Sequence, residues 1–392
     1  MAASSIAPQA PCPLPMPPTK PLTLPIDIEH FLAEYWQRKP LLIRNAIADF
    51  EVPLDADELA GLAMEAEVES RIVEEAGGAW ALSHGPFTEA DFQRPPPWTL
   101  LVQAVDQFVP EVAALQQLAA FIPQWRADDV MVSYATDGGS VGPHFDYYDV
   151  FLLQGEGERL WRLGQHCDSS SPLLAGCDMR VLEHFECQQE CLLEPGDLLY
   201  VPPGLAHWGI ARGECTTFSI GFRAPARRDL LARLTDTALD SSNADNLLAD
   251  PQRAGADRSG EITATDLENA RRQAIALLQD EQSPHWFGEL VTEPRYDLKA
   301  GDVDEADIRA LLKGETPLYR DPTGRLAWTR QGDDLVVFAN GASCDAPGAM
   351  LPWLTDFCAR GQADCGDLEN LHPQASGLLY FLLESGAACI DG

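Results

Sequence analysis

The sequence predicts a mixed, β-dominated fold: a barrel of two β-sheets, then helices, then a small α+β domain. Three observations support this prediction. Between Asp129 and Phe222, short apolar runs alternate with glycine- and proline-containing turns at roughly 8–12-residue spacing, which is typical of a sandwich or barrel. After Pro225 the apolar residues adopt helical spacing. From Gly301 onward, helical and strand patterns alternate in an order that fits a winged-helix-like domain.

The segments before the barrel show mixed patterns. Asp27 can cap a helix whose apolar residues, Phe31 and Leu32 among them, recur at helical spacing. Pro40 ends that helix, and an apolar strand follows. The further segments predicted here are the strand Leu41–Ile43, a helix over Asp55–Glu65, strands at Ser70–Val73 and Ala79–Leu82, and helices at Trp98–Phe108 and Glu111–Phe121.

The barrel itself is predicted from six short strands separated by tight turns. A jelly roll of the cupin type (a double-stranded β-helix) is the two-sheet arrangement that encloses a central site. The predicted strands are Val130–Tyr134, Val150–Gln154, Arg159–Leu163, Cys191–Glu194, Leu198–Val201 and Thr216–Phe222.

The C-terminal part is predicted to be mainly helical. Thr265 and Glu268 have the spacing of a capping box and would open a helix that runs to about Gln279. The other elements expected are helices at Asp229–Leu239, Glu305–Lys313, Met350–Arg360 and Ser376–Glu384, a strand at Pro317–Arg320 and a hairpin over Leu326–Ala339. The expected division is a disordered, proline-rich lead-in (1–25), a catalytic barrel domain (26–225), a helical region (226–295) and a winged-helix-like domain (296–392).

The charge of the chain limits its partners. The 392 residues carry a net charge of −34, which disfavours phosphate backbones and attracts basic proteins, although acidity can also serve solubility alone. Residues 301–392 contain six Lys or Arg and fifteen Asp or Glu, so direct nucleic-acid binding by this domain is not expected. No apolar run approaches the roughly 20 residues of a membrane helix, and no secretory signal is evident. A cytoplasmic protein without membrane contact is therefore predicted.

Two histidines and one aspartate form a candidate metal site. His144 and Asp146 are two residues apart, so on a strand both side chains would project from one face. His207 follows a Pro-Gly-Asp turn, a short apolar strand and a Pro-Pro-Gly turn that would hold it in a fixed place. Two imidazoles and one carboxylate are the donor set that holds non-haem Fe(II) with open coordination positions. His-x-Asp alone is a weak signal that an ordinary strand with two polar residues would explain better, so the prediction depends on all three residues.

Arg159 is a candidate anchor for an anionic cosubstrate. It follows the Gly155–Gly157 turn, and if this turn made a hairpin, Arg159 would return toward the metal site. A guanidinium group binds a carboxylate through two parallel hydrogen bonds, so Arg159 could hold one end of a dicarboxylate whose other end chelates iron. The alternative is a surface arginine beside Arg162.

Longer strings of residues resemble a known family. The chain is similar to the JmjC-type 2-oxoglutarate oxygenases, and more closely to the bacterial ribosomal oxygenases that hydroxylate an arginine of a large-subunit ribosomal protein. The resemblance extends from about Ile26 to the C-terminus. The segments that carry it are Phe31–Trp36 with Lys39-Pro40, Asp57–Glu65, Ser83–Phe87, Gly142–Asp146, Glu194–Asp197, Pro202–Gly204 with His207, and Ser219–Pro225.

This resemblance implies a set of roles. Fe(II) would be held by His144, Asp146 and His207, and 2-oxoglutarate and O₂ would be cosubstrates. Arg159 would pair with the distal carboxylate of 2-oxoglutarate. Ser133 would make a further contact to it, and Thr217 stands near the place where some relatives have asparagine. The family also implies a homodimer formed through the central helices.

An arginine substrate favours an acidic and aromatic entrance to the site, because guanidinium pairs with carboxylates and stacks on rings. Tyr148 and Asp149 are the candidate substrate contacts, and strand packing is the alternative for both. We therefore expect an Fe(II)- and 2-oxoglutarate-dependent hydroxylase that modifies C3 of an arginine in a ribosomal protein of the L-sixteen family. The alternatives are a JmjC histidyl hydroxylase, a lysine demethylase, or a metal-binding cupin without oxygenase chemistry, against which Arg159 argues.

Overall fold

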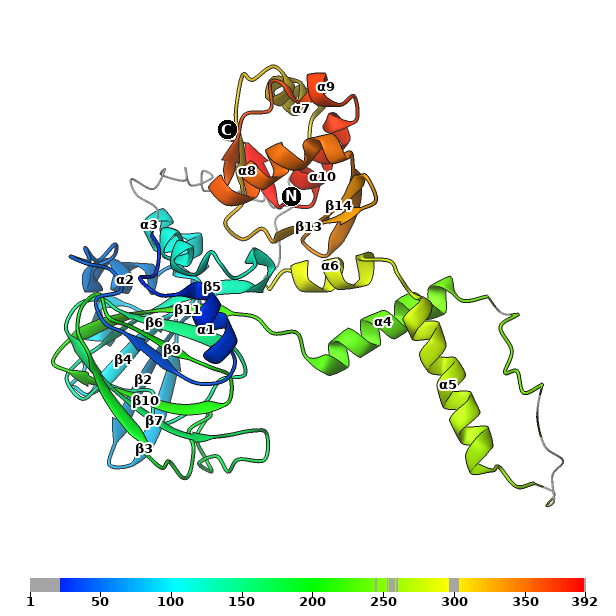
Figure 1. Cartoon of the computed structure of the whole chain (residues 1–392). Coiled ribbons are helices and arrows are strands. Elements are labelled where there is room, and N and C mark those ends of the chain that lie inside the picture. Colours follow the sequence, from blue (N-terminus) through cyan, green and yellow to red (C-terminus); the bar gives the residue numbers. More distant parts are fainter. Residues whose placement is uncertain are drawn as a thin grey trace, which may run out of the picture. The chain divides into compact units, whose positions relative to one another are not determined.

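The computed structural model describes residues 22–243, 245–251, 253, 258, 260–295 and 303–390. The chain forms two compact units that meet in the sequence between Ala224 and Pro225 (Figure 1). Most of the predicted disordered lead-in lies outside the described residues. Residues 22–25 do not fit the prediction of disorder, because Leu24 is buried and Leu22 packs against the same core.

The first unit is built on two antiparallel sheets. The larger has the order β1-β9-β6-β11-β5-β4-β2-β3, and the smaller has the order β10-β7-β8. The strands of the larger sheet are β1 (Leu41–Ile43), β2 (Ser70–Ala76), β3 (Ala79–His84), β4 (Trp98–Val102), β5 (Ala127–Ala135), β6 (Asp149–Gln154), β9 (Leu198–Val201) and β11 (Cys215–Phe222). Those of the smaller sheet are β7 (Glu158–His166), β8 (Gln189–Leu193) and β10 (Leu205–Arg212).

The two sheets face each other across an apolar layer. Because side chains alternate along a strand, each strand contributes every second residue to this inner layer. Leu152 of β6 and Leu199 of β9 pack there with Trp161 of β7 and Leu193 of β8. The result is the predicted β-dominated barrel with an enclosed interior.

Short helices cover the outer face of the larger sheet. They are α1 (Ile28–Glu34), α2 (Ala56–Leu62), α3 (Pro110–Ala113) and the 3-10 helix Ala114–Ala119. Asp27 caps α1, and Asp55 forms a capping box with Glu58 at the start of α2, as the residue types favour. Phe31 of α1 joins the core that includes Phe151 and Phe218 on the outer face of the sheet.

The predicted helix Trp98–Phe108 is wrong. Trp98–Val102 forms β4, which pairs with β2 on one side and β5 on the other. Four of its five residues are buried, so the strand lacks the polar alternation that distinguishes a strand from a helix in a short apolar run. Strand β10 was not predicted at all, although it carries His207.

The second unit begins with three helices: α4 (Arg227–Ser241), α5 (Ala264–Asp280) and α6 (His285–Thr292). The capping box of α5 consists of Thr263 and Asp266, not of the predicted Thr265 and Glu268. Threonine and an acidic residue recur two positions apart here, so the spacing alone could not choose between the two pairs.

The rest of this unit has its own core and a winged-helix-like order of elements. Leu354, Phe357, Leu379 and Leu382 are buried together in it. The elements are α7 (Glu305–Leu312), β12 (Leu318–Arg320), β13 (Leu326–Gln331), β14 (Asp334–Ala339), β15 (Ala342–Ala346), α8 (Leu351–Arg360), β16 (Gln362–Ala363), α9 (Leu368–Leu371), α10 (Ala375–Glu384) and β17 (Ala388–Ile390). Within the described residues of the chain, no helix is both long and apolar enough to cross a bilayer.

Phe31 and Leu32 provide a paired test of how α1 is anchored. Phe31 is 1% exposed, with its ring centroid 5.0 Å from Tyr200 and 5.8 Å from Phe151, whereas Leu32 is 40% exposed. We expect Phe31→Ala to lower the free energy of unfolding by about 3–5 kcal/mol. Leu32→Ala should change it by about 0.5 kcal/mol or less. Urea denaturation followed by circular dichroism measures both, and equal losses would contradict the packing described.

Candidate active site

Three potential metal ligands come together inside the barrel. The ligand atoms of His144, Asp146 and His207 all lie within 4.8 Å of one another. Asp146 Oδ2 is 3.9 Å from Nε2 of His144 and 3.5 Å from Nε2 of His207. Two imidazoles and one carboxylate in such a cluster match the donor set of a facial triad.

Backbone hydrogen bonds hold these residues in place. The N–H of His144 donates to the carbonyl of His207 at 3.0 Å, and the N–H of His207 donates to the carbonyl of His144 at 2.8 Å. The carbonyl of Asp146 accepts from the N–H of Gly204 at 2.7 Å. The expectation that His144 and Asp146 share a strand is wrong, because β6 begins only at Asp149. His144 instead forms an isolated bridge to β10.

Both histidines present the same nitrogen to the cluster. Nδ1 of His144 lies 3.0 Å from the carbonyl of Gly142, and Nδ1 of His207 lies 3.0 Å from the carbonyl of Leu205. A carbonyl oxygen only accepts, so Nδ1 carries the proton and Nε2 keeps its lone pair. Burial, with the neighbouring His144, lowers the pKa of His207 to about 4, which keeps this imidazole neutral at physiological pH.

Ser140 joins the two ligand-bearing segments through its side chain. Its Oγ accepts hydrogen bonds from Trp208 Nε1 at 2.8 Å and from the N–H of Gly142 at 3.1 Å. Trp208 is the residue after His207, and Gly142 lies two residues before His144. No sequence signal indicates this role, because a serine in a turn has many possible uses.

Arg159 lies on the inner face of β7, and the predicted hairpin before it does not form. The Gly155–Gly157 turn crosses from the larger sheet to the smaller one. Arg159 is 3% exposed, its Nη2 lies 3.5 Å from Cys215 Sγ, and its Nε has no hydrogen-bond partner. Among the described residues no carboxylate pairs with it. A buried cation without a counter-charge is costly, so the interior fits an anionic ligand beside Arg159.

Ser133 and Thr217 lie on the wall of the same interior. They are directly paired residues of β5 and β11, and Thr217 is also paired with Gln154 of β6. Ser133 Oγ donates to the Thr217 carbonyl at 3.5 Å, and Thr217 Oγ1 donates to Gln154 Oε1 at 3.4 Å. Both hydroxyl groups are therefore weakly engaged and can reorient toward a ligand.

Gln154 was not singled out from the sequence, yet it fixes the crossover before Arg159. Its Nε2 donates to the carbonyls of Glu156 at 3.0 Å, Gly157 at 3.3 Å and Thr216 at 3.0 Å. The sequence signal available was a glutamine placed directly before the Gly-Glu-Gly turn.

The two predicted substrate contacts have different environments. Tyr148 is 43% exposed, and burial of its hydroxyl, with the nearby carboxylate of Asp146, raises its pKa above the ordinary value. Asp149 is fully buried, and its carboxylate accepts hydrogen bonds from Tyr200 at 2.6 Å, Gln37 at 2.9 Å and Arg126 at 3.3 Å. A carboxylate enclosed in this way cannot meet a protein substrate, so Asp149 is a structural residue of the sheet's outer face.

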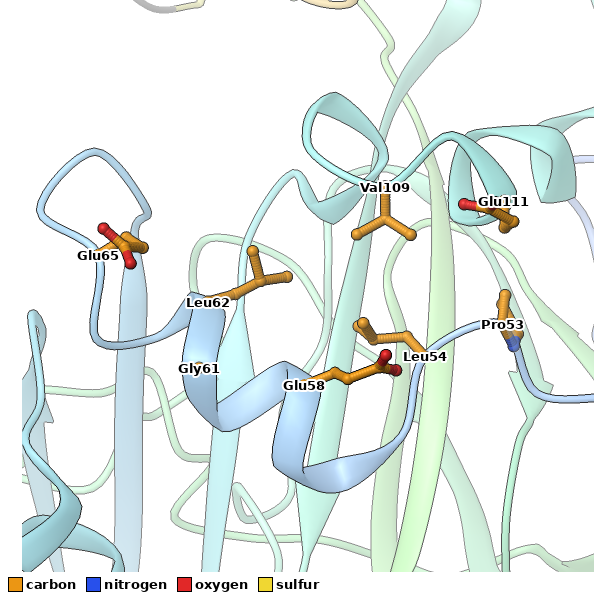
Figure 2. Close-up of a pocket in the computed structure, with 8 residues that line it drawn as sticks. All are labelled: Pro53, Leu54, Glu58, Gly61, Leu62, Glu65, Val109 and Glu111. Atoms are coloured by element: carbon orange, nitrogen blue, oxygen red, sulfur yellow. The ribbon is translucent and has the colours of Figure 1, made fainter. Parts of the chain in front are cut away.

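A surface pocket of about 460 Å³ lies elsewhere on the first unit, between α2 and the start of α3 (Figure 2). None of the candidate site residues described above lines it. Its lining is part acidic and part apolar: Pro53, Leu54, Glu58, Gly61, Leu62, Glu65, Val109 and Glu111.

Comparison with known proteins gives consistent matches along the chain. The JmjC domain matches residues 114–230, a ROXA-like winged helix matches residues 271–388, and the AraC-like ligand binding domain matches residues 184–293. The ribosomal protein uL16 3-hydroxylase of Escherichia coli is 37% identical over 94% of this chain and 99% of its own length. A probable ribosomal oxygenase of Haemophilus influenzae is 32% identical over 93% of this chain and 95% of its own length.

A solved structure with bound ligands is also similar. The ribosomal oxygenase YcfD from Escherichia coli, in complex with cobalt and 2-oxoglutarate, is 35% identical. It superposes with a TM-score of 0.78 over 94% of this chain and 99% of that one.

Substitution of Asp149 tests whether this residue stabilises the fold, as its hydrogen bonds indicate. Asp149→Ala would leave Arg126, Gln37 and Tyr200 without their shared acceptor, so we expect the free energy of unfolding to fall by about 3 kcal/mol or more. Glu183→Ala, at an exposed carboxylate, is the matched control and should cost about 0.5 kcal/mol or less. Chemical denaturation measures the free energy of unfolding of both variants. An unchanged free energy of unfolding in Asp149→Ala would contradict the structural role.

Proposed function

The chain belongs to the JmjC-domain ribosomal oxygenases, and from this we propose that it hydroxylates C3 of an arginine in a large-subunit ribosomal protein related to uL16. It is an Fe(II)- and 2-oxoglutarate-dependent oxygenase. One observation carries the proposal most directly: the interior that holds the His144, Asp146 and His207 cluster also holds a buried arginine, Arg159, with which no carboxylate of the described residues pairs.

The donor set and the interior fit the metal and its cosubstrate. When bound, Fe(II) with 2-oxoglutarate and O₂ supplies the oxidant for an unactivated C–H bond and releases succinate and CO₂. His144, Asp146 and His207 would hold the metal and leave about three of six positions open. Arg159 would pair with the distal carboxylate of 2-oxoglutarate, and Ser133 and Thr217 would offer hydroxyl groups to it.

Charge and an exposed ring support a basic substrate. The net charge of −34 attracts strongly basic proteins such as those of the ribosome. Tyr148, next to the metal cluster, would offer its exposed ring to a guanidinium group. The alternatives are less favoured, because the relatives matched over more than nine-tenths of the chain are named as a uL16 3-hydroxylase and a ribosomal oxygenase.

We further propose a homodimer that works in the cytoplasm, where ribosomal proteins are made, without contacting nucleic acid or membrane directly. The proposed division is a catalytic domain (26–225), on whose core Leu22 and Leu24 also pack, a helical dimerisation region (226–295) and a winged-helix-like domain (296–392). Apolar side chains on the central helices support self-association: α5 has no buried residue, and Leu231, Leu239 and Leu267 are more than half exposed.

Removal of a metal ligand tests the proposed reaction. Asp146→Ala or His144→Ala should abolish release of succinate in the presence of Fe(II), 2-oxoglutarate and a peptide that contains the uL16 arginine. Ser170→Ala, in an exposed turn, should retain the wild-type rate. The modified residue is identified by tandem mass spectrometry of the peptide. Addition of one oxygen atom to histidine, or loss of a methyl group from lysine, would favour the alternative reactions.

Arg159 and Arg162 distinguish a cosubstrate anchor from a surface cation. Both lie on β7, but Arg162 forms an ion pair with Glu190 and is partly exposed. We expect Arg159→Ala to raise the KM for 2-oxoglutarate by about 30-fold or more, because it removes one partner of a buried charge pair. Arg162→Ala should leave this KM unchanged. An unaltered dependence on 2-oxoglutarate in Arg159→Ala, measured by succinate release, would remove Arg159 from the site.

A further inference from the structure

Trp161 carries a buried hydrogen-bond donor that the described protein does not satisfy. It lies on β7, on the inner face of the barrel, and is 5% exposed. Its indole Nε1 has no hydrogen-bond partner. Buried donors are nearly always paired, because an unpaired one loses its interaction with water without replacement. The N–H therefore indicates an acceptor that the described residues do not provide.

The neighbouring strand fixes the direction of the indole ring. Gly209 of β10 is directly opposite Trp161, and a Cβ at Gly209 would lie 2.9 Å from Cζ3 and from Cη2 of the ring. The benzene edge thus occupies the space that a side chain at Gly209 would need. Nε1 belongs to the five-membered ring, at the other end of the indole from these two atoms.

Trp161 also lies between the two parts of the site. Its ring centroid is 5.9 Å from that of His207, and the guanidinium carbon of Arg159 is 5.9 Å from the same ring. A ligand that reaches from the metal cluster to Arg159 would therefore pass beside Trp161. Arg159 Nε and Trp161 Nε1 are both unpaired donors, two residues apart on one face of the strand.

We propose that Trp161 is a cosubstrate-binding residue whose indole N–H donates to the distal carboxylate of 2-oxoglutarate, next to Arg159. The inference rests on the proposed use of 2-oxoglutarate. It assigns Trp161 a specificity role, because a ligand without the distal carboxylate would leave both donors unpaired.

Calorimetry on the Zn(II)-loaded protein tests this without turnover. Trp161→Phe keeps a ring over Gly209 and removes the N–H, so we expect 2-oxoglutarate to bind about tenfold more weakly. In 2-oxopentanoate a methyl group replaces the distal carboxylate, and its affinity should be the same for Trp161→Phe and the wild type. Trp353→Phe, which also loses an indole hydrogen bond but lies on α8, is the matched control and should bind like the wild type.

The outcomes separate this proposal from the proposed function. If the wild type does not bind 2-oxoglutarate, the proposed function fails. If the wild type binds but Trp161→Phe binds equally well, or loses affinity for both ligands alike, the role of Trp161 is overturned. A second measurement needs no variant: among the indole ¹⁵N–H signals of the nine tryptophans, one should move to higher proton frequency with 2-oxoglutarate but not with 2-oxopentanoate. No such movement would also overturn the proposal.

Discussion

The reciprocal backbone hydrogen bonds between His144 and His207 are the constraint on which the site depends. His144 lies on the segment that leads into β6 of the larger sheet, and His207 belongs to β10 of the smaller one. The metal cluster can therefore form only when the two sheets face each other. Packing of the apolar layer between the sheets therefore also brings the metal ligands together. Ser140 links the same two segments through its hydrogen bonds.

The interior of the barrel is divided between packing and binding. Leu152, Leu193 and Leu199 fill one part and stabilise the sheets against each other. Arg159 and Trp161 place donors without a partner among the described residues in the other part, which costs free energy unless a ligand accepts from them. A bound dicarboxylate would accept from these donors and remove that cost. The two side chains would therefore also select the ligand. Asp149, buried on the outer face of the larger sheet, shows the opposite case, because its hydrogen bonds are satisfied within the protein.

Much of this arrangement was predictable from local patterns. Turn residues and short apolar runs predicted most of the barrel strands, and the spacing of His144, Asp146 and His207 predicted residues that the structure does bring together. The wrong capping box of α5 is a local error, whereas the errors in the barrel concern long-range pairing. Trp98–Val102 lies between two strands and so has no polar face, and the turn before Arg159 crosses between sheets. Nor could the sequence distinguish the buried Asp149 from the exposed Tyr148, since both follow the same motif.

We propose above all that this site oxidises an arginine of a ribosomal protein at the expense of 2-oxoglutarate. The most direct measurement is mass spectrometry of the ribosomal proteins from cells that lack the gene and are complemented with either the wild type or Asp146→Ala. We expect the uL16 homologue to gain the mass of one oxygen atom, located on an arginine, only with the wild type. The same mass with both proteins, or a gain on a residue other than arginine, would contradict it.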